Sequence, residues 1–416
     1  MSTTPSNVTN VAQPPSASTK PRWRVQDYLD LNLIGATHGL SDGFAKLLVP
    51  VLALIVADLQ LSVFQAGLLL SSFTAAEFLF LYPLSTLADH SGHKKLILIG
   101  GLGLATVAFL AMYWTSSFWL LVALAFLAGA GNAVYHPCGT ALTALRFADR
   151  RALAISYHGM WGNIGVSIVP VLQAAVAAWS GWRTAVALCA LPALVLLPLI
   201  GIRFPSGKTI HSAAQSGSLR NSFKALTGQV VRNRSIVLLA LTYALNGLST
   251  KGMTGFLPLL AATKFGMDTA TIGIILTCYF GAGVVAKPLM GLLYDRWGAR
   301  SALFTPLLLT GVLTLALGFT PWSATLIVLA IVTGIFTPIS PIILTAAADV
   351  ADEKVLASSI GLIYTCYGLG FLSPLIGGWL ADHFQLSAGY LFFAIMAWLG
   401  AMVALRLPAQ RYAARP

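Results

Sequence analysis

Charged residues are scarce in this chain of 416 residues. Asp, Glu, Lys and Arg together make up 9% of the sequence, whereas hydrophobic residues make up 57%. A typical soluble domain carries about 25% charged residues. Because so few charges cannot cover a protein surface with polar groups, we expect lipid to be the solvent of most of this chain. Spanning segments in lipid are either helices or the strands of a closed barrel.

Alternating strand patterns, catalytic motifs and cysteine frameworks are also missing. The apolar runs are long and continuous, which favours helices over barrel strands. No Walker motif, nucleophile elbow or His/Cys metal spacing is present. The four cysteines lie singly inside apolar runs, where small packing residues are expected. We therefore expect no enzymatic activity, no cofactor, no metal and no step driven by ATP.

The apolar runs divide the chain into two sets of six. A spanning helix needs about 20 apolar residues, and the predicted fold is all-α with twelve transmembrane helices. The expected organisation is a disordered tail over 1–22, a six-helix bundle over 23–203, a polar basic linker over 204–233, a second bundle over 234–408 and a tail over 409–416. The expected spans are 29–58, 63–88, 94–114, 118–142, 152–178, 182–203, 234–262, 270–293, 300–319, 323–348, 355–381 and 387–407.

Basic residues outnumber acidic ones, 25 to 13, and the net charge is +12. If the N-terminus is cytoplasmic, twenty of the basic residues fall on cytoplasmic connections and tails, and only Arg183 and Lys264 fall on external loops. Cytoplasmic loops of membrane proteins carry an excess of Lys and Arg. Both termini are therefore predicted to be cytoplasmic. The excess of basic residues reflects the membrane topology and implies no nucleic-acid partner.

The two halves repeat each other along the sequence. Residues 39–41 and Pro50 match residues 247–249 and Pro258, the segment 87–92 matches 293–298, and Pro170 matches Pro374. Each match falls on the corresponding helix at nearly the same offset. Two parallel halves with a binding site between them are typical of a secondary transporter.

Two short segments carry a resemblance to a known family. Residues 85–95 are Ser-Thr-Leu-Ala-Asp-His-Ser-Gly-His-Lys-Lys, and residues 291–300 are Gly-Leu-Leu-Tyr-Asp-Arg-Trp-Gly-Ala-Arg. Both resemble the signature G-x-L-A-D-R-x-G-R-K of Major Facilitator Superfamily transporters, although Ser85 and two histidines depart from it in the first copy. The resemblance covers nearly the whole chain and implies two bundles that rock about a central cavity. It also implies gating residues at the cytoplasmic turns, unless these charges only anchor the topology: Asp89, Gly92, Lys94, Lys95, Gly291, Asp295, Arg296, Gly298 and Arg300.

A narrower resemblance comes from the fourth and fifth expected helices. Residues 129–137 are Gly-Ala-Gly-Asn-Ala-Val-Tyr-His-Pro, and residues 162–165 are Gly-Asn-Ile-Gly, followed by Pro170. These segments resemble the fosmidomycin-resistance branch of bacterial exporters, from which Cys138 and Gly139 depart. The resemblance implies export by proton antiport across a bacterial inner membrane.

Charged side chains also occur inside the expected spans, at a cost of at least about 2.5–3.5 kcal/mol each near the bilayer centre. His38, Asp42 and Lys46 are spaced four residues apart, which places them on one helical stripe. Asp42 can pair with either neighbour, or Asp42 and Lys46 can form a fixed structural ion pair. Glu77 lies in the next span. We predict that Asp42 or Glu77 carries a coupling proton, and we favour Asp42 because of its two neighbours.

The remaining polar residues of the spans complete a candidate cavity. The two carboxylates are outnumbered by three lysines, which favours an anionic or zwitterionic substrate. His38 and His136 can instead be neutral core histidines, and His158 and Lys287 can reach toward the membrane surface. The aromatic residues Trp161, Tyr243, Tyr279, Tyr364 and Tyr367 are packing residues or a substrate platform. The candidates are His38, Asp42, Lys46, Glu77, Tyr135, His136, His158, Asn163, Asn246, Lys251 and Lys287.

The sequence therefore predicts a proton-coupled carrier of a small organic solute or drug, working by alternating access and functional as a monomer. Its partners are the solute, protons and the bilayer. Efflux by antiport is favoured, uptake by proton symport is the alternative, and a membrane sensor that transports nothing is the alternative from another class.

Overall fold

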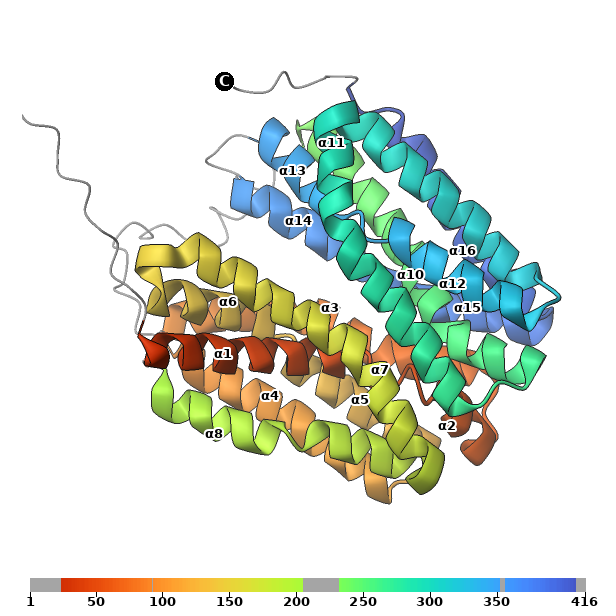
Figure 1. Ribbon diagram of the computed structural model, residues 1–416, viewed down its shortest axis with the longest axis horizontal. Coiled ribbons are helices and arrows are strands. Elements are labelled where there is room, and N and C mark those ends of the chain that lie inside the picture. The colour runs from red at the N-terminus through yellow and green to blue at the C-terminus, as the bar shows by residue number, and fades with distance from the viewer. Residues whose placement is uncertain (1–23, 92, 205–231, 352–355, 409–416) are drawn as a thin grey trace, which may run out of the picture.

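Helices form all the regular secondary structure in the described part of the chain. The computed structural model describes residues 24–91, 93–204, 232–351 and 356–408, and it contains no strand there. The expected tails, most of the linker, Gly92 and Lys354 lie outside the described residues. Two groups of helices lie side by side, one formed before residue 204 and one after residue 232 (Figure 1).

The first group contains eight α-helices, and the second contains seven in the described residues. Those of the first group are α1 (Val25–Phe44), α2 (Leu52–Leu59), α3 (Val63–Ser91), α4 (Lys94–Ala111), α5 (Phe118–Asn132), α6 (Tyr135–Arg146), α7 (Arg151–Ala190) and α8 (Ala193–Arg203). Those of the second group are α10 (Arg234–Phe265), α11 (Thr269–Phe319), α12 (Ser323–Phe336), α13 (Ser340–Val350), α14 (Leu356–Gly368), α15 (Leu372–His383) and α16 (Leu386–Ala404).

Proline and glycine explain where the helices break. α1 ends at Phe44, and a turn that contains Pro50 separates it from α2. The expected fourth span is divided just before Pro137, which lies in the first turn of α6. Proline is tolerated in a first turn, whereas in the interior of a helix it would remove a backbone hydrogen bond. α7 and α11 each consist of two helices joined at a glycine, Gly181 with φ 78° and Gly298 with φ 70°. Only glycine adopts such angles readily, and both glycines lie at predicted connections between spans.

Eight helical stretches are long and apolar enough to cross a membrane. Two of them, Leu153–Arg203 and Thr269–Phe319, turn back at these glycines, so each accounts for two of the expected spans. The expected spans 29–58 and 234–262 fall outside this set. The first is divided between α1 and the short α2, and the second contains Lys251 and several other polar residues. The all-α membrane architecture is confirmed, whereas the count of twelve spans is supported only in part.

Ion pairs tie the first group together at one end of the molecule, which we call the basic end. The buried carboxylate of Asp30 in α1 accepts hydrogen bonds from Arg146 of α6 at 2.7 Å and from Arg203 of α8 at 2.5 Å. Asp27 accepts a further bond from Arg146 at 2.9 Å. Three helices that would otherwise end separately are thereby fixed to each other.

The two groups meet at the opposite end, which we call the closed end. There α3 packs on α15 and α7 packs on α11. A Cβ atom added to Gly67 of α3 would collide with the carbonyl of Pro374, and one added to Gly273 of α11 would lie 2.8 Å from the carbonyl of Pro170. Such close contacts require glycine. Toward the basic end the groups diverge, with α6 on one side and α13 and α14 on the other (Figure 1).

Candidate functional site

A cavity of about 260 Å³ lies between the two groups. Asp42, Lys46 and Asn163 line it from the first group. The second group contributes polar and aromatic side chains from α10, α11, the α12–α13 region and α14, including Tyr243, Asn246, Lys251, Tyr279, Lys287 and Tyr367. Six candidates from the sequence (Asp42, Lys46, Asn163, Asn246, Lys251 and Lys287) are therefore brought together. Three of the five aromatic candidates also line this cavity.

Three lysine side chains reach the cavity, and each contacts neutral groups. The Nζ atom of Lys46 lies 5.6 Å from the centre of the Phe280 ring, and that of Lys251 lies 4.9 Å from the centre of the Tyr367 ring. Lys287 donates to the Oδ1 atom of Asn163 across the interface between the groups. Among the described residues, no carboxylate forms an ion pair with any of the three. The cavity therefore holds more positive than negative charge.

Lys46 does not continue the stripe of His38 and Asp42. The stripe assumes an unbroken helix, but α1 ends at Phe44, so Lys46 lies in the following turn. No ion pair joins it to Asp42 in the described structure, which removes the alternative of a fixed structural pair. His38 keeps its predicted position one turn before Asp42, with 3.5 Å between His38 Nε2 and Asp42 Oδ2.

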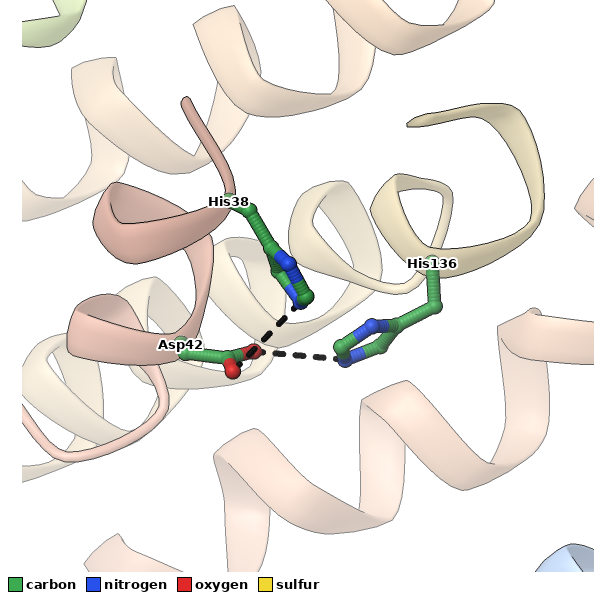
Figure 2. A group of neighbouring side chains, drawn as sticks. All are labelled: His38, Asp42 and His136. Carbon is green, nitrogen blue, oxygen red and sulfur yellow. Dashed lines mark ion pairs between the residues drawn. The ribbon is translucent and has the colours of Figure 1, made fainter. Parts of the chain in front are cut away.

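His136 completes a cluster with these two residues. Its Nε2 atom lies 3.5 Å from the second carboxylate oxygen of Asp42, and its side chain is 54% exposed. Figure 2 shows His38 and Asp42 on one helix and His136 on another, with both rings directed at the carboxylate. Since α1 and α6 are far apart in sequence, only the folded structure brings the second imidazole to Asp42.

The hydrogen bonds of His158 and His38 determine which nitrogen of each ring carries a hydrogen. Tyr135 donates its hydroxyl hydrogen to the carbonyl of Ile34 at 2.8 Å, so the Nε2 atom of His158, 3.0 Å from that hydroxyl, must be the donor to it. His38 Nδ1 lies 2.8 Å from the carbonyl of His158 and must donate as well. A neutral His38 then presents its Nε2 lone pair to Asp42. Two lone pairs face each other there, so the site needs a proton or another cation.

Glu77 forms no ion pair with this cluster in the described structure, although it lies within electrostatic range of His136. Its Oε1 atom accepts a hydrogen bond from Asn132 at 2.9 Å, and Asn132 accepts one from Ser41 of α1 at 2.9 Å. Glu77 does not line the cavity described above. Ser41 and Asn132 were not candidates from the sequence, although Asn132 lies in the segment that resembles the exporter branch. Asn132 links Glu77 to Ser41, and Ser41 directly precedes Asp42 on α1.

Asn246 has an unusual environment within the cavity lining. It is 3% exposed, and its side-chain oxygen has no hydrogen-bond partner among the described residues. A buried acceptor without a partner costs about 1–3 kcal/mol. It is therefore ready to accept a hydrogen bond from a solute or from water in the cavity.

The predicted gating residues of the first half lie around the turn after α3. Lys95 donates to the carbonyls of Gly201 and Phe204 at 2.8 and 2.9 Å, which joins α4 to the end of α8. Lys94 is buried, and its Nζ atom lies 3.4 Å from the carbonyl of Ala88. Asp89 is a residue of α3, but its side chain, like Gly92, lies outside the described part of the structure.

The second copy lies at the turn inside α11. Asp295 and Arg296 are exposed, and Gly298 provides the positive φ that reverses the chain. Arg300 donates to the carbonyl of Leu407 at 2.8 Å, which ties this turn to the residues after α16. A Cβ atom at Gly291 would meet nothing within 4 Å, so packing does not require a glycine there.

Asp382 at the end of α15 was not among the residues predicted from the sequence. Its two carboxylate oxygens accept from the backbone N–H groups of Val63 at 2.8 Å and Phe64 at 3.0 Å. These are the first two residues of α3, so the contact joins the two groups at the closed end. A signal was present: residues 380–383 are Leu-Ala-Asp-His, the same four residues as 87–90 in the signature.

Comparison with known proteins decides the family. The sequence profile of the Major Facilitator Superfamily matches residues 34–259 and 239–416. The chain belongs to this superfamily. It is therefore a multi-pass membrane transporter and not an enzyme, which confirms the resemblance found in the signature segments.

The relatives of this superfamily member include resistance proteins. It is 24% identical to the fosmidomycin resistance protein of Escherichia coli over 395 residues, which cover 92% of this chain and 93% of that protein. It is 27% identical to the chloramphenicol resistance protein CraA of Acinetobacter baumannii, over 68% of this chain and 67% of that protein. The fold matches an inward-facing, unoccupied bacterial homologue of the lysosomal transporter Spinster with a TM-score of 0.80 at 13% identity, covering 92% and 97% of the two chains.

Proposed function

We propose that this protein is a proton-coupled secondary transporter that moves a small organic anion or zwitterion across a bacterial inner membrane by alternating access, with efflux by antiport. The observation that carries the proposal is the group of three cavity lysines, none of which forms an ion pair with a carboxylate among the described residues. Buried ammonium groups without a carboxylate partner are costly in a membrane unless an anion compensates them. An anionic solute supplies that compensation, and the unpartnered oxygen of Asn246 offers one acceptor for a solute N–H group.

The distribution of basic residues indicates the side of the membrane to which the cavity opens. Lys and Arg are concentrated in the segments at the basic end, so this end is the cytoplasmic one and both termini lie inside. The bundles, 23–203 and 234–408, then contact each other on the outer side and diverge toward the cytoplasm. This inward-facing form is the one in which an exporter collects its solute. Gating by Asp89 and Asp295 during the change of form, and function as a monomer, remain part of the proposal.

Asp42 is the favoured proton carrier. It lines the cavity, and His38 can stay neutral beside it only if a proton or another cation lies between them. Glu77 accepts its hydrogen bond from a neutral amide and does not line the cavity. Proton binding at Asp42 alters the charge that an anionic solute meets, which is the physical link between the two fluxes.

The similarity to resistance proteins supports export of a drug or a related metabolite. The test begins with purified protein in a thermal-shift screen of anionic, zwitterionic, neutral and cationic metabolites and antibiotics. Compounds that raise the melting temperature are then used in counterflow, where liposomes loaded with unlabelled compound accumulate a labelled trace. We expect counterflow with an anionic or zwitterionic compound. Binding without counterflow indicates the sensor instead, and accumulation of cations alone contradicts the assignment of the cavity.

A further inference from the structure

The cluster of His38, Asp42 and His136 has the wrong spacing for strong hydrogen bonds. Both nitrogen–oxygen distances are 3.5 Å, whereas N–H···O bonds in proteins are usually about 2.7–3.2 Å long. All the candidate donor atoms nevertheless lie within 4.8 Å of one another. A tetrahedral zinc ion with bonds of about 2.0–2.1 Å separates neighbouring ligand atoms by about 3.4 Å. The two nitrogen–oxygen distances of 3.5 Å, which end on the two oxygens of Asp42, are close to this separation.

From this geometry we infer that His38 Nε2, His136 Nε2 and the carboxylate of Asp42 form a binding site for a divalent transition metal ion, Zn²⁺ in the first place. Two imidazoles and a carboxylate are ligands that suit Zn²⁺, Co²⁺ and Ni²⁺ rather than Mg²⁺ or Ca²⁺. Three protein ligands leave one position open, as in zinc sites that bind water or a solute. This site is independent of whether transport is coupled to protons.

The surroundings of His38 orient it as metal ligands are oriented. Its Nδ1 atom donates to the backbone carbonyl of His158 at 2.8 Å, which leaves the Nε2 lone pair directed at Asp42. Zinc-bound histidines usually donate their other ring N–H to a carbonyl or carboxylate in this way. The ring also stacks on Tyr135 and on His158, at centroid distances of 5.2 and 4.2 Å. The ligand is therefore held in its binding orientation before an ion arrives.

A glycine leaves the space for the ion. A Cβ atom added to Gly162 of α7 would lie 2.9 Å from His38 Nε2 and in collision with Asp42 Oδ2. That position is close to both donor atoms, where an ion shared by them would also be. Access is available, because His136 is half exposed and Asp42 lines the cavity. A bound ion would compete with a proton for Asp42 and so is expected to inhibit proton-coupled transport.

The test is direct metal binding to the full-length protein, purified through a tag that contains no histidine. Co²⁺ is titrated into the protein, and its visible absorption reports coordination by nitrogen and oxygen ligands while calorimetry gives the stoichiometry. We expect one Co²⁺ per chain, displaced by Zn²⁺ and not by Mg²⁺. Gly162→Ala should weaken binding by about 10–100-fold or more while every ligand remains, and His136→Ala should weaken it at least as much.

Gly159→Ala is the matched control, because a Cβ atom there, one turn earlier on α7, meets nothing within 4 Å. It should bind Co²⁺ like the unmodified protein. If Gly162→Ala does not fold, the half-exposed His136→Ala still decides. No Co²⁺ binding by the unmodified protein at millimolar concentration overturns the site, as does binding that neither Gly162→Ala nor His136→Ala weakens. Metal binding in a protein that fails in counterflow supports the site and contradicts only the transport assignment.

Discussion

Asp382 is predicted to hold the closed end of the protein shut. Its carboxylate accepts two backbone hydrogen bonds from Val63 and Phe64 at the start of α3, where helix N–H groups have no partner in their own helix. Asp382 belongs to α15 of the other bundle, so the bonds exist only while the bundles are in contact at this end. The change Asp382→Asn keeps the size of the side chain but removes the negative charge and one acceptor.

The magnitude follows from helix capping. A side chain that caps a helix N-terminus contributes about 0.5–2 kcal/mol, and a negative charge near the helix dipole adds to it. We expect Asp382→Asn to weaken the closed end by about 1–2 kcal/mol, which changes the ratio of the two conformations by about 5–30-fold. The inward-facing form should lose population to the outward-facing form.

Pulsed electron spin resonance can measure this shift. Spin labels at Ala57→Cys and Phe384→Cys, both exposed, report the distance across the closed end in a background without the four native cysteines. Asp382→Asn should add or enlarge a population at longer distance. Asp268→Asn is the control, because Asp268 accepts from Thr271 at 2.7 Å within its own helix. Equal distance distributions for Asp382→Asn and the unmodified protein would refute the role of the carboxylate.

Three further predictions concern other parts of the molecule. Lys251→Ala should weaken binding of an anionic ligand, identified by thermal shift, by about 5–30-fold, because one or two kcal/mol of charge attraction is lost; unchanged affinity would remove this lysine from the site. Asp30→Ala should destabilise the protein by about 1–3 kcal/mol, since Arg203 loses its carboxylate partner and Arg146 keeps only Asp27. The melting temperature in detergent checks this against the more exposed Asp27→Ala. Reporter fusions near Ser216 and Arg415 should both be cytoplasmic, and an external result at either place contradicts the orientation.

Much of the fold could be predicted because lipid imposes simple rules on a sequence. Long apolar runs mark spanning helices, and the turns at Gly181 and Gly298 fall at connections that were predicted between spans. The pair of His38 and Asp42 was also predictable, since four residues along a helix bring side chains together. The break of α1 at Phe44 was harder to foresee, and it is this break that separates Lys46 from the stripe.

Contacts between distant segments could not be predicted from local patterns. His136 reaches Asp42 because α6 packs on α1, and Lys287 reaches Asn163 because the two bundles meet. Neither pairing leaves a fixed spacing in the sequence. Asp382 is different, since its segment repeats the signature tetrapeptide, but the partner at the start of α3 becomes evident only when the closed end is formed.

The central claim, that the cavity exchanges an anionic solute against protons through Asp42, can be tested in liposomes that contain the protein and the internal pH indicator pyranine. A ligand from the thermal-shift screen is added outside, without any imposed pH gradient. Antiport predicts that the internal pH rises as the solute enters, and that Asp42→Asn abolishes the change while counterflow of the solute persists. A fall in internal pH would establish symport instead, and a full response in Asp42→Asn, or a response to cationic solutes alone, would contradict the account.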